Sequence, residues 1–484
     1  MTTSRYGSTA GPLRMLRVLG LTAAVAACMP VQAFGLMDAF VAARQYDPQY
    51  RAAWQEREAG AQEERIARSQ LLPQASLTYG YNRNWLNQRV ESPATGQSQH
   101  RSNANYPSYS GAVEVRQPLI NMQAWAAYRQ GQAMTQVANA EFDASHQELM
   151  LRLYEAYSGA LLARDQLAIA KAQHIALGEQ MRSNERMFKA GEGTLTDMIE
   201  TRSRHDMTRA QLIEAEDALA NAMRTLDTVI GTGHYDSVDE LDHLVPKFKP
   251  SANQVDGIDQ WIQLALGSNS QIEAGRFSVQ AADAEVARRR AGHYPTLDLV
   301  AAHGLNEADS VTTINQRNRT SVVGVQLRVP LYSGGSVSAS TTQAVARFER
   351  ARAELDAVRA GVLVELRRQH GLIRSNAAKI QALESAVSSA QLLVEATRKS
   401  VVGGVRVNLD VLNAEQQLYT SRRDLAQARY DYLNAYMQLR YYAGVLSVDD
   451  METVARYFAP AGSGEAGTAY AGVKKKKAGP IARK

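Results

Sequence analysis

Apolar side chains recur at steps of three and four residues along two long stretches of this 484-residue chain. The stretches are 119–245 and 331–459, and neither contains a proline. The recurrence is clearest over 149–181 and 355–394, where many of the apolar positions are alanine. This spacing is typical of helices that pack lengthwise against neighbours. Since proline costs about 3 kcal/mol in a helix interior, its absence agrees with two long, coiled-coil-like helices.

A glycine pair interrupts each stretch, at Gly191 and Gly193 and at Gly403 and Gly404. About 70 helical residues precede each break, roughly 105 Å at ~1.5 Å per residue, whereas only about 35 follow it. The pattern predicts two helical hairpins with unequal arms. A further helix of about 35 residues precedes each pair of strands described next. Stacking this helix end to end on the short arm would give a combined length equal to that of the long arm. These further helices are expected over 37–70 and 260–291.

A different period, strict alternation of apolar and polar residues, occurs in four short segments. They form two expected β-hairpins, at 75–118 and 296–331, with strands of about ten residues. We expect polar stretches at 91–105 and 306–319 to separate the strands. Alternation of this kind suits strands with one face in lipid and the other in a wet lumen. A soluble pair of hairpins would show the same alternation.

The order of elements occurs twice along the chain. Pro73 and Pro295, Pro118 and Pro330, and Gly231 and Gly444 are separated by 222, 212 and 213 positions. Corresponding breaks in the same order at nearly constant spacing indicate an internal duplication. The expected organisation is a signal peptide at 1–33, a first repeat at 34–231, an equatorial linker at 232–258, a second repeat at 259–444, and an equatorial segment with a flexible basic tail at 445–484.

The amino terminus has the features of a secretory signal. Arg14 and Arg17 precede an apolar run at 18–27, which is too short to span a membrane, and small residues follow it. We place cleavage after Ala33. The alternative is lipidation at Cys28, the single cysteine, within a lipoprotein-like box.

The net charge of +5 does not indicate a nucleic-acid partner. Residues 1–33 contribute +3 and residues 461–484 contribute +5, so the body between them carries −3. A mildly acidic body is not the electrostatic footprint of a DNA-binding protein. The nine histidines show no metal-ligand spacing, and no nucleophile motif occurs in a suitable context. We therefore expect no enzyme activity, no metal and no cofactor.

Four strands cannot close a barrel in a membrane. Bacterial single-chain barrels need at least about eight strands, and an open sheet edge is not viable in lipid. Several chains must therefore contribute to one barrel, and cyclic symmetry gives eight strands from two chains or twelve from three. The sequence pattern alone does not choose between them.

Several local motifs resemble the TolC family of outer-membrane channels, most closely its type I secretion branch. The motifs are Tyr46-Asp-Pro48 with Leu71-Leu-Pro-Gln74, Tyr294-Pro-Thr-Leu-Asp-Leu299, Val329-Pro-Leu-Tyr-Ser-Gly-Gly335, and Leu409-Asp-Val-Leu-Asn-Ala414 with Ala426-Gln-Ala-Arg-Tyr-Asp-Tyr432. The resemblance implies a mainly α fold with β-strands. It also implies a homotrimer, with a 12-stranded barrel in outer-membrane lipid and a long periplasmic α-helical tunnel.

The resemblance also implies a gate at the periplasmic tips, where inward-coiled helices and aspartates close the tunnel. The matching residues are Thr196, Asp197, Arg406 and Asp410. Asn413 stands where a second aspartate is expected, and Val401 stands where the family pattern has a tyrosine. The alternative role for the polar residues is capping of helix N-termini, worth about 0.5–2 kcal/mol.

The function implied by the resemblance is a passive exit duct of a type I secretion system. Its partners would be an inner-membrane ABC transporter, a periplasmic adaptor and an exported protein, for which an RTX-type toxin is one candidate. Two alternatives stay open. One is the outer-membrane component of a small-molecule or drug efflux pump. The other is a periplasmic adaptor or coiled-coil scaffold, although an adaptor would carry a single helical hairpin.

Overall fold

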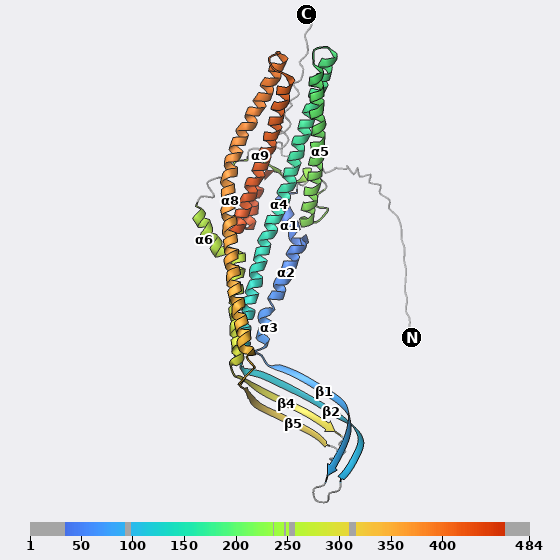
Figure 1. Cartoon of the computed structure of the whole chain (residues 1–484), viewed down its shortest axis with the longest axis vertical. Coiled ribbons are helices and arrows are strands. Elements are labelled where there is room, and N and C mark those ends of the chain that lie inside the picture. Colours follow the sequence, from blue (N-terminus) through green and yellow to red (C-terminus); the bar gives the residue numbers. More distant parts are fainter. Residues whose placement is uncertain are drawn as a thin grey trace, which may run out of the picture.

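A computed structural model describes residues 34–91, 98–235, 237–245, 248–250, 257–308 and 316–459. The chain is elongated, with a long helical body and a four-stranded sheet at one end of it (Figure 1). The predicted signal peptide with Cys28 and Ala33 lies outside the described residues, as does the basic tail after residue 459.

Four long helices form two hairpins, as the glycine breaks predict. The long arms are α4 (Met122–Lys189, 68 residues) and α8 (Ser336–Val402, 67 residues). The short arms are α5 (Leu195–Ile230, 36 residues) and α9 (Asn408–Tyr442, 35 residues). The predicted lengths and their inequality are therefore confirmed, and the two hairpins extend side by side away from the sheet (Figure 1).

The single helix expected over 37–70 is wrong, because three helices occupy this range. They are α1 (Leu36–Tyr46), α2 (Pro48–Gly60) and α3 (Glu63–Ser69). Proline lacks a backbone N–H and fits the first turn of a helix. Pro48 therefore begins a new helix, whose N-terminus is capped by the Asp47 carboxylate accepting from the Tyr50 N–H at 2.7 Å.

The equivalent helix of the second repeat is also divided, into α6 (Ile258–Ser268) and α7 (Ser270–Arg290), with a short 3₁₀ turn after α7. Asn269 separates them, and its side chain caps α7 by accepting from the Ile272 N–H at 3.1 Å.

The predicted end-to-end stacking is present at the junction between α9 and α7. Asn269 Nδ2 donates to the carbonyl oxygen of Tyr442, the last residue of α9, at 3.0 Å. Gly444 follows in a left-handed conformation with φ 73°, and a Cβ at this position would lie 2.3 Å from the Ser268 carbonyl oxygen. In the first repeat, Gly231 at the end of α5 lies against the ring of Tyr46 at the end of α1.

The strands form one antiparallel sheet in the order β1-β2-β4-β5. Their bounds are Gln74–Glu91, Ser98–Ile120, Thr296–Ala308 and Gln316–Arg328. They are longer than the ten residues expected, and parts of the polar stretches 91–105 and 306–319 are strand rather than separator. The physical reason is that a ladder bonds backbone to backbone, so it continues where polar side chains replace apolar ones.

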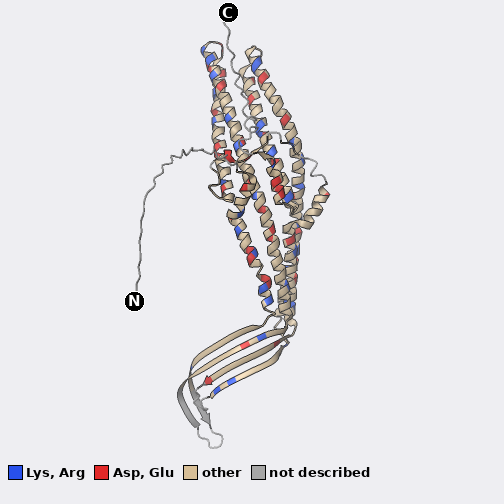
Figure 2. Ribbon diagram, turned by 180° about the vertical axis from the view of Figure 1, so that it is seen from behind, with Lys and Arg blue, Asp and Glu red and all other residues tan. Residues whose placement is uncertain are grey.

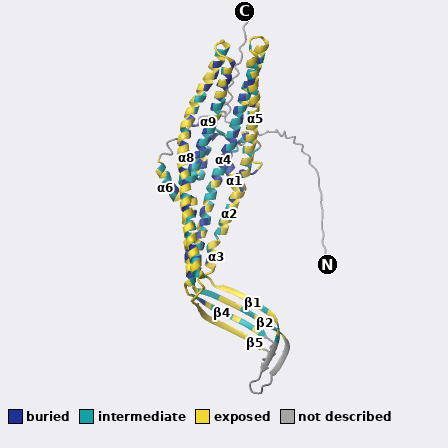
Figure 3. Ribbon diagram, in the orientation of Figure 1, coloured by how far each residue is buried: buried dark blue, intermediate teal, exposed yellow. Residues whose placement is uncertain are grey.

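The predicted alternation places the apolar residues on one face of the sheet. Leu77 lies opposite Val113 in β2, and Leu299 in β4 lies opposite Val325 in β5. Many residues of the strands are exposed in the protomer (Figure 3). Leu77 is one of them, at 76% exposure. The opposite face carries an ion pair between Arg116 of β2 and Asp298 of β4, which joins the two β-hairpins.

Four aromatic residues also share the apolar face: Tyr79, Tyr81, Trp85 and Tyr109. The Tyr81 and Tyr109 rings are cross-strand neighbours with centroids 5.0 Å apart. Tyr106 lies opposite Asn84 in the ladder and therefore belongs to the other face.

The core is densest where the long helices meet the segments that follow α5 and α9. Leu153, Tyr154 and Tyr157 of α4 are fully buried there. A two-stranded sheet pairs β3 (His243–Leu244) with β6 (Phe458–Ala459), so the segment after α5 lies beside the segment after α9. The assignment of both segments to an equatorial region stays a prediction.

Within the described residues, no helix is both long enough and apolar enough to span a bilayer.

Candidate gate at the hairpin tips

The two helical hairpins end in tight turns at the pole of the molecule opposite the sheet (Figure 1). Gly191 ends the first long arm with φ 77°, and Gly404 ends the second with φ 73°. Residues with a Cβ rarely adopt this conformation, which explains the glycine at each break. A cavity of about 720 Å³ lies between the tips, and both hairpins contribute to its lining.

The first turn of α5 is capped by Thr194, next to the predicted gate residues Thr196 and Asp197. The Thr194 hydroxyl accepts from the Asp197 N–H at 3.0 Å and donates to an Asp197 carboxylate oxygen at 2.5 Å. The N-cap of α5 is therefore Thr194, and Asp197 is the acidic residue of the first turn, with its side chain lining the cavity. Thr196 is exposed beside it.

A buried hydrogen-bonded cluster joins the two hairpins just inside the tips. The Thr201 hydroxyl of α5 accepts from Asn184 Nδ2 of α4 at 2.7 Å and from Asn408 Nδ2 of α9 at 3.0 Å. Gln180 Nε2 of α4 lies within bonding distance of the amide oxygens of Asn184 and Asn408, at 3.1 Å from each. Thr201 is fully buried, and both asparagines are buried. We call these four residues the tip cluster.

Polar pairs continue from the tip cluster along the contact between α4 and α9. Gln173 bonds to Gln416 at 3.0 Å, and Gln166 bonds to Gln427 at 3.3 Å. Gln166, Gln173 and Gln180 are spaced by seven residues and so share one side of α4. Hydrogen bonds therefore hold this contact between the repeats. Neither this contact nor the tip cluster was predicted from the sequence, although the seven-residue spacing of these glutamines was a visible signal.

The predicted gate residues of α9 have different surroundings. The side-chain oxygen of Asn413 accepts from Arg204 of α5 at 2.9 Å, which adds another bond between the hairpins. Arg406 is exposed and lines the cavity together with Asp197. Asp410 is half-buried and is not part of that lining. Within the described residues, the side chains of Arg406 and Asp410 form no hydrogen bond or ion pair.

An ion pair holds the second hairpin together below its turn. Arg398 of α8 bonds to Glu415 of α9, whose side chain is only 3% exposed. The second carboxylate oxygen of Glu415 is buried and has no hydrogen-bond partner in the described structure.

Two histidines stack between α4 and α5 farther from the tip. The His174 and His205 ring centroids are 4.3 Å apart, and His174 Nδ1 lies 3.0 Å from the Thr208 hydroxyl. Burial, with smaller contributions from His205 and Arg209, lowers the pKa of His174. The two rings therefore pack against each other between α4 and α5.

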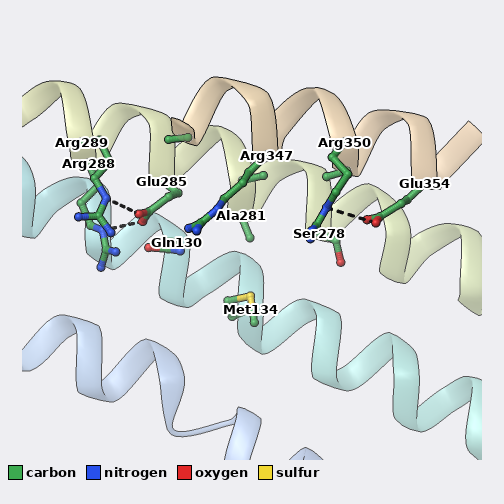
Figure 4. Close-up of a pocket in the computed structure, with 13 residues that line it drawn as sticks. Gln130, Met134, Ser278, Ala281, Glu285, Arg288, Arg289, Arg347, Arg350 and Glu354 are labelled. Atoms are coloured by element: carbon green, nitrogen blue, oxygen red, sulfur yellow. Dashed lines mark hydrogen bonds and ion pairs between the residues drawn. The ribbon is translucent and has the colours of Figure 1, made fainter. Parts of the chain in front are cut away.

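Charged side chains are spread over the helices and are sparse on the strands (Figure 2). Near the sheet, a groove of about 490 Å³ lies between α4, α7 and α8 (Figure 4). Glu285 pairs there with Arg288 and Arg289, and Arg350 pairs with Glu354 (Figure 4). The described residues contain no group of three or more metal-ligating side chains.

The family described as outer membrane efflux protein matches residues 40–232 and 261–445 of the chain. The alkaline protease secretion protein AprF of Pseudomonas aeruginosa is 40% identical over 426 residues, 88% of each chain. The proteases secretion protein PrtF of Dickeya chrysanthemi is 41% identical over 430 residues, 88% of this chain and 92% of the relative.

A solved structure shows the same fold at lower identity. The outer membrane protein VceC of Vibrio cholerae superimposes with a TM-score of 0.72 at 19% identity, covering 84% of this chain and 96% of that one. With both halves of the duplication matched in sequence, the chain belongs to the outer membrane efflux protein family.

Proposed function

We propose that the protein is the outer-membrane exit duct of a type I secretion system. The observation that carries the proposal is the 40% and 41% identity to AprF and PrtF, whose names assign them to protease secretion. The cargo would be an exported protein, delivered by an inner-membrane ABC transporter through a periplasmic adaptor. No chemical transformation is required of such a duct.

The sheet supports assembly from several copies. β1 and β5 are the edge strands of the described sheet, and an edge with unpaired backbone groups is not viable in lipid. Pairing β5 of one copy with β1 of the next would satisfy both edges. Three copies would give the 12-stranded barrel, with the exposed apolar face toward lipid and the face of Arg116 and Asp298 toward the lumen.

We also propose that the hairpin tips form the periplasmic gate. Each tip bond between the repeats joins polar groups that water can satisfy after separation, so the tips can part at lower cost than an apolar contact of the same length. Arg406 and Asp410 have no side-chain partner among the described residues of their own protomer, which suits groups that bond across the trimer axis. Each copy contributes the carboxylates of Asp197 and Asp410, so three copies would bring six carboxylates toward one axis. Their repulsion would oppose closure.

The test uses a host that lacks its own channel and carries a protease exporter with its adaptor. We expect this protein to restore protease secretion and to appear in the outer-membrane fraction as a heat-resistant trimer. Resistance to small toxic compounds, measured in the same strain with a drug pump and its adaptor, separates secretion from efflux. Recovery as a soluble periplasmic monomer would overturn the proposal.

A further inference from the structure

The residue that follows the predicted cleavage site is tightly held. The Phe34 N–H donates to the Glu240 carbonyl oxygen at 2.9 Å, and the Phe34 carbonyl oxygen accepts from the Tyr157 hydroxyl at 3.1 Å. Its backbone pairs in parallel with Leu241, and its ring stacks on His234 with centroids 5.8 Å apart. The start of the predicted mature chain is therefore fixed against the segment 238–244.

Two carboxylates lie against the next residue, Gly35. An Asp38 oxygen accepts from the Gly35 N–H at 3.1 Å. An Asp242 oxygen lies 3.0 Å from the position that a Cβ on Gly35 would occupy, and Asp38 lies 3.4 Å from it. The second oxygen of Asp242 is buried without a hydrogen-bond partner in the described structure. Burial, and then the charge of Asp38, raise the pKa of Asp242.

This acid pair has no cationic partner among the described residues, since neither Asp38 nor Asp242 forms an ion pair there. Arg164 contacts both the neighbouring His243 and Asp165. The Tyr157 hydroxyl accepts from the Asp242 N–H at 3.1 Å, and both His234 and the Glu240 carbonyl oxygen contact Phe34. Asp242 is half-buried and Asp38 is exposed beside it, and two carboxylates at close range repel each other unless a positive charge lies near them.

Hydrolysis of the Ala33–Phe34 peptide bond would create that charge. Water adds across the bond, which leaves a carboxylate on Ala33 and an ammonium group on Phe34. This nitrogen belongs to the residue before Gly35, and the Cα atoms of consecutive residues are about 3.8 Å apart. We propose that the α-ammonium group of processed Phe34 is the counter-ion of the Asp38–Asp242 pair, and so fastens α1 to the segment 238–244 once the signal peptide is removed.

The consequence concerns maturation. In the uncleaved chain the Phe34 nitrogen is a neutral amide with one N–H, which Glu240 already accepts. After cleavage the same atom has three N–H donors and a positive charge. Removal of the signal peptide therefore strengthens the attachment of α1 to the segment 238–244.

The experiment uses the full-length protein exported and purified in detergent. Intact mass should show a chain that begins at Phe34. An amine-acylating reagent is applied over a range of pH, and acylation of the α-amine is followed by mass spectrometry of the N-terminal peptide. An ordinary α-amine has a pKa of about 7.7–8.0. We expect the pH midpoint of acylation in the parent protein to lie above this range. In Asp242→Asn the midpoint should fall by about one pH unit, which corresponds to about tenfold faster labelling at pH 7.

Two controls keep the outcome specific. Asp239→Asn changes an exposed acid on the same segment and should leave the midpoint in place. Insertion of one serine before Phe34 keeps both acids but displaces the ammonium group, and should lower the midpoint as Asp242→Asn does. The proposal is overturned if the midpoint is the same in the parent protein and in Asp242→Asn, or if the mature chain begins at a residue other than Phe34. Neither result would bear on protease secretion.

Discussion

Asn408 at the start of α9 donates a hydrogen bond from Nδ2 to the hydroxyl oxygen of Thr201 on α5, at 3.0 Å. The bond joins the short arms of the two hairpins, which lie more than 200 residues apart in the chain. Asn184 donates to the same oxygen. One hydroxyl is thus the common acceptor for both repeats at the proposed gate.

Replacement of that hydroxyl should favour the open state. In Thr201→Val the shape of the side chain is kept, but two buried amide donors lose their acceptor. An unsatisfied buried donor costs about 1–3 kcal/mol, and separation of the tips would allow water to satisfy both. We expect larger and more frequent conductance in planar bilayers. Thr225→Val is the matched control, because the exposed Thr225 hydroxyl bonds only to a carbonyl of its own helix.

Conductance of Thr201→Val equal to that of the parent protein would contradict a role of the tip cluster in closure.

The charged residues of α9 allow a separate test of the gate. If Arg406 and Asp410 bond across the trimer axis, Arg406→Ala and Asp410→Ala should each raise conductance, and the double variant should add little to the larger single effect. Such non-additivity is expected for residues that act through one contact. Arg367→Ala removes an exposed arginine in the interior of α8 and serves as the control. Unchanged conductance in both single variants would show that these residues do not hold the gate closed.

The glycine after α9 should tolerate substitution far less than the glycine at the tip. Gly444 and Gly404 both have φ 73°. Alanine in this conformation costs about 1–2 kcal/mol. At Gly444 a Cβ would also lie 2.3 Å from the Ser268 carbonyl oxygen, whereas at Gly404 it meets nothing within 4 Å. We expect Gly444→Ala to lower the temperature at which the assembled protein dissociates much more than Gly404→Ala does. Equal effects would mean that the junction between α9 and α7 yields easily.

The lengths of the four long helices could be predicted because proline and glycine act locally, and their effect does not depend on tertiary contacts. The apolar face of the sheet was also predictable, since Leu77 and Val113 follow a strict period of two. The ends of the strands were not, because backbone pairing between β1 and β2 continues through polar residues. The tip cluster was missed for another reason. Asn184, Thr201 and Asn408 are ordinary helix-surface residue types, and only the packing of three helices buries them together.

Acidification should weaken the α4–α5 hairpin through its stacked histidines. Burial lowers the pKa of His174, so the unfolded chain, with an ordinary histidine pKa of about 6.5, binds a proton more readily than the folded one. The stabilising contribution is therefore complete above about pH 6.5 and is lost as the pH falls below it. His205 and Arg209 are the groups that act on the His174 ring, and Asp206 lies beside His205, with Oδ1 3.6 Å from Nδ1.

His174→Gln keeps a partner for the Thr208 hydroxyl but removes the titrating group. We expect it to reduce the loss of thermal stability between pH 7.5 and 5, and to slow amide hydrogen exchange of residues 195–215 at pH 5 relative to the parent protein. His293→Gln, which replaces an exposed histidine near the sheet, should leave the pH dependence as it is. The same slope of stability against pH in His174→Gln and the parent protein would exclude the stacked pair as its cause, because no other change separates the two proteins.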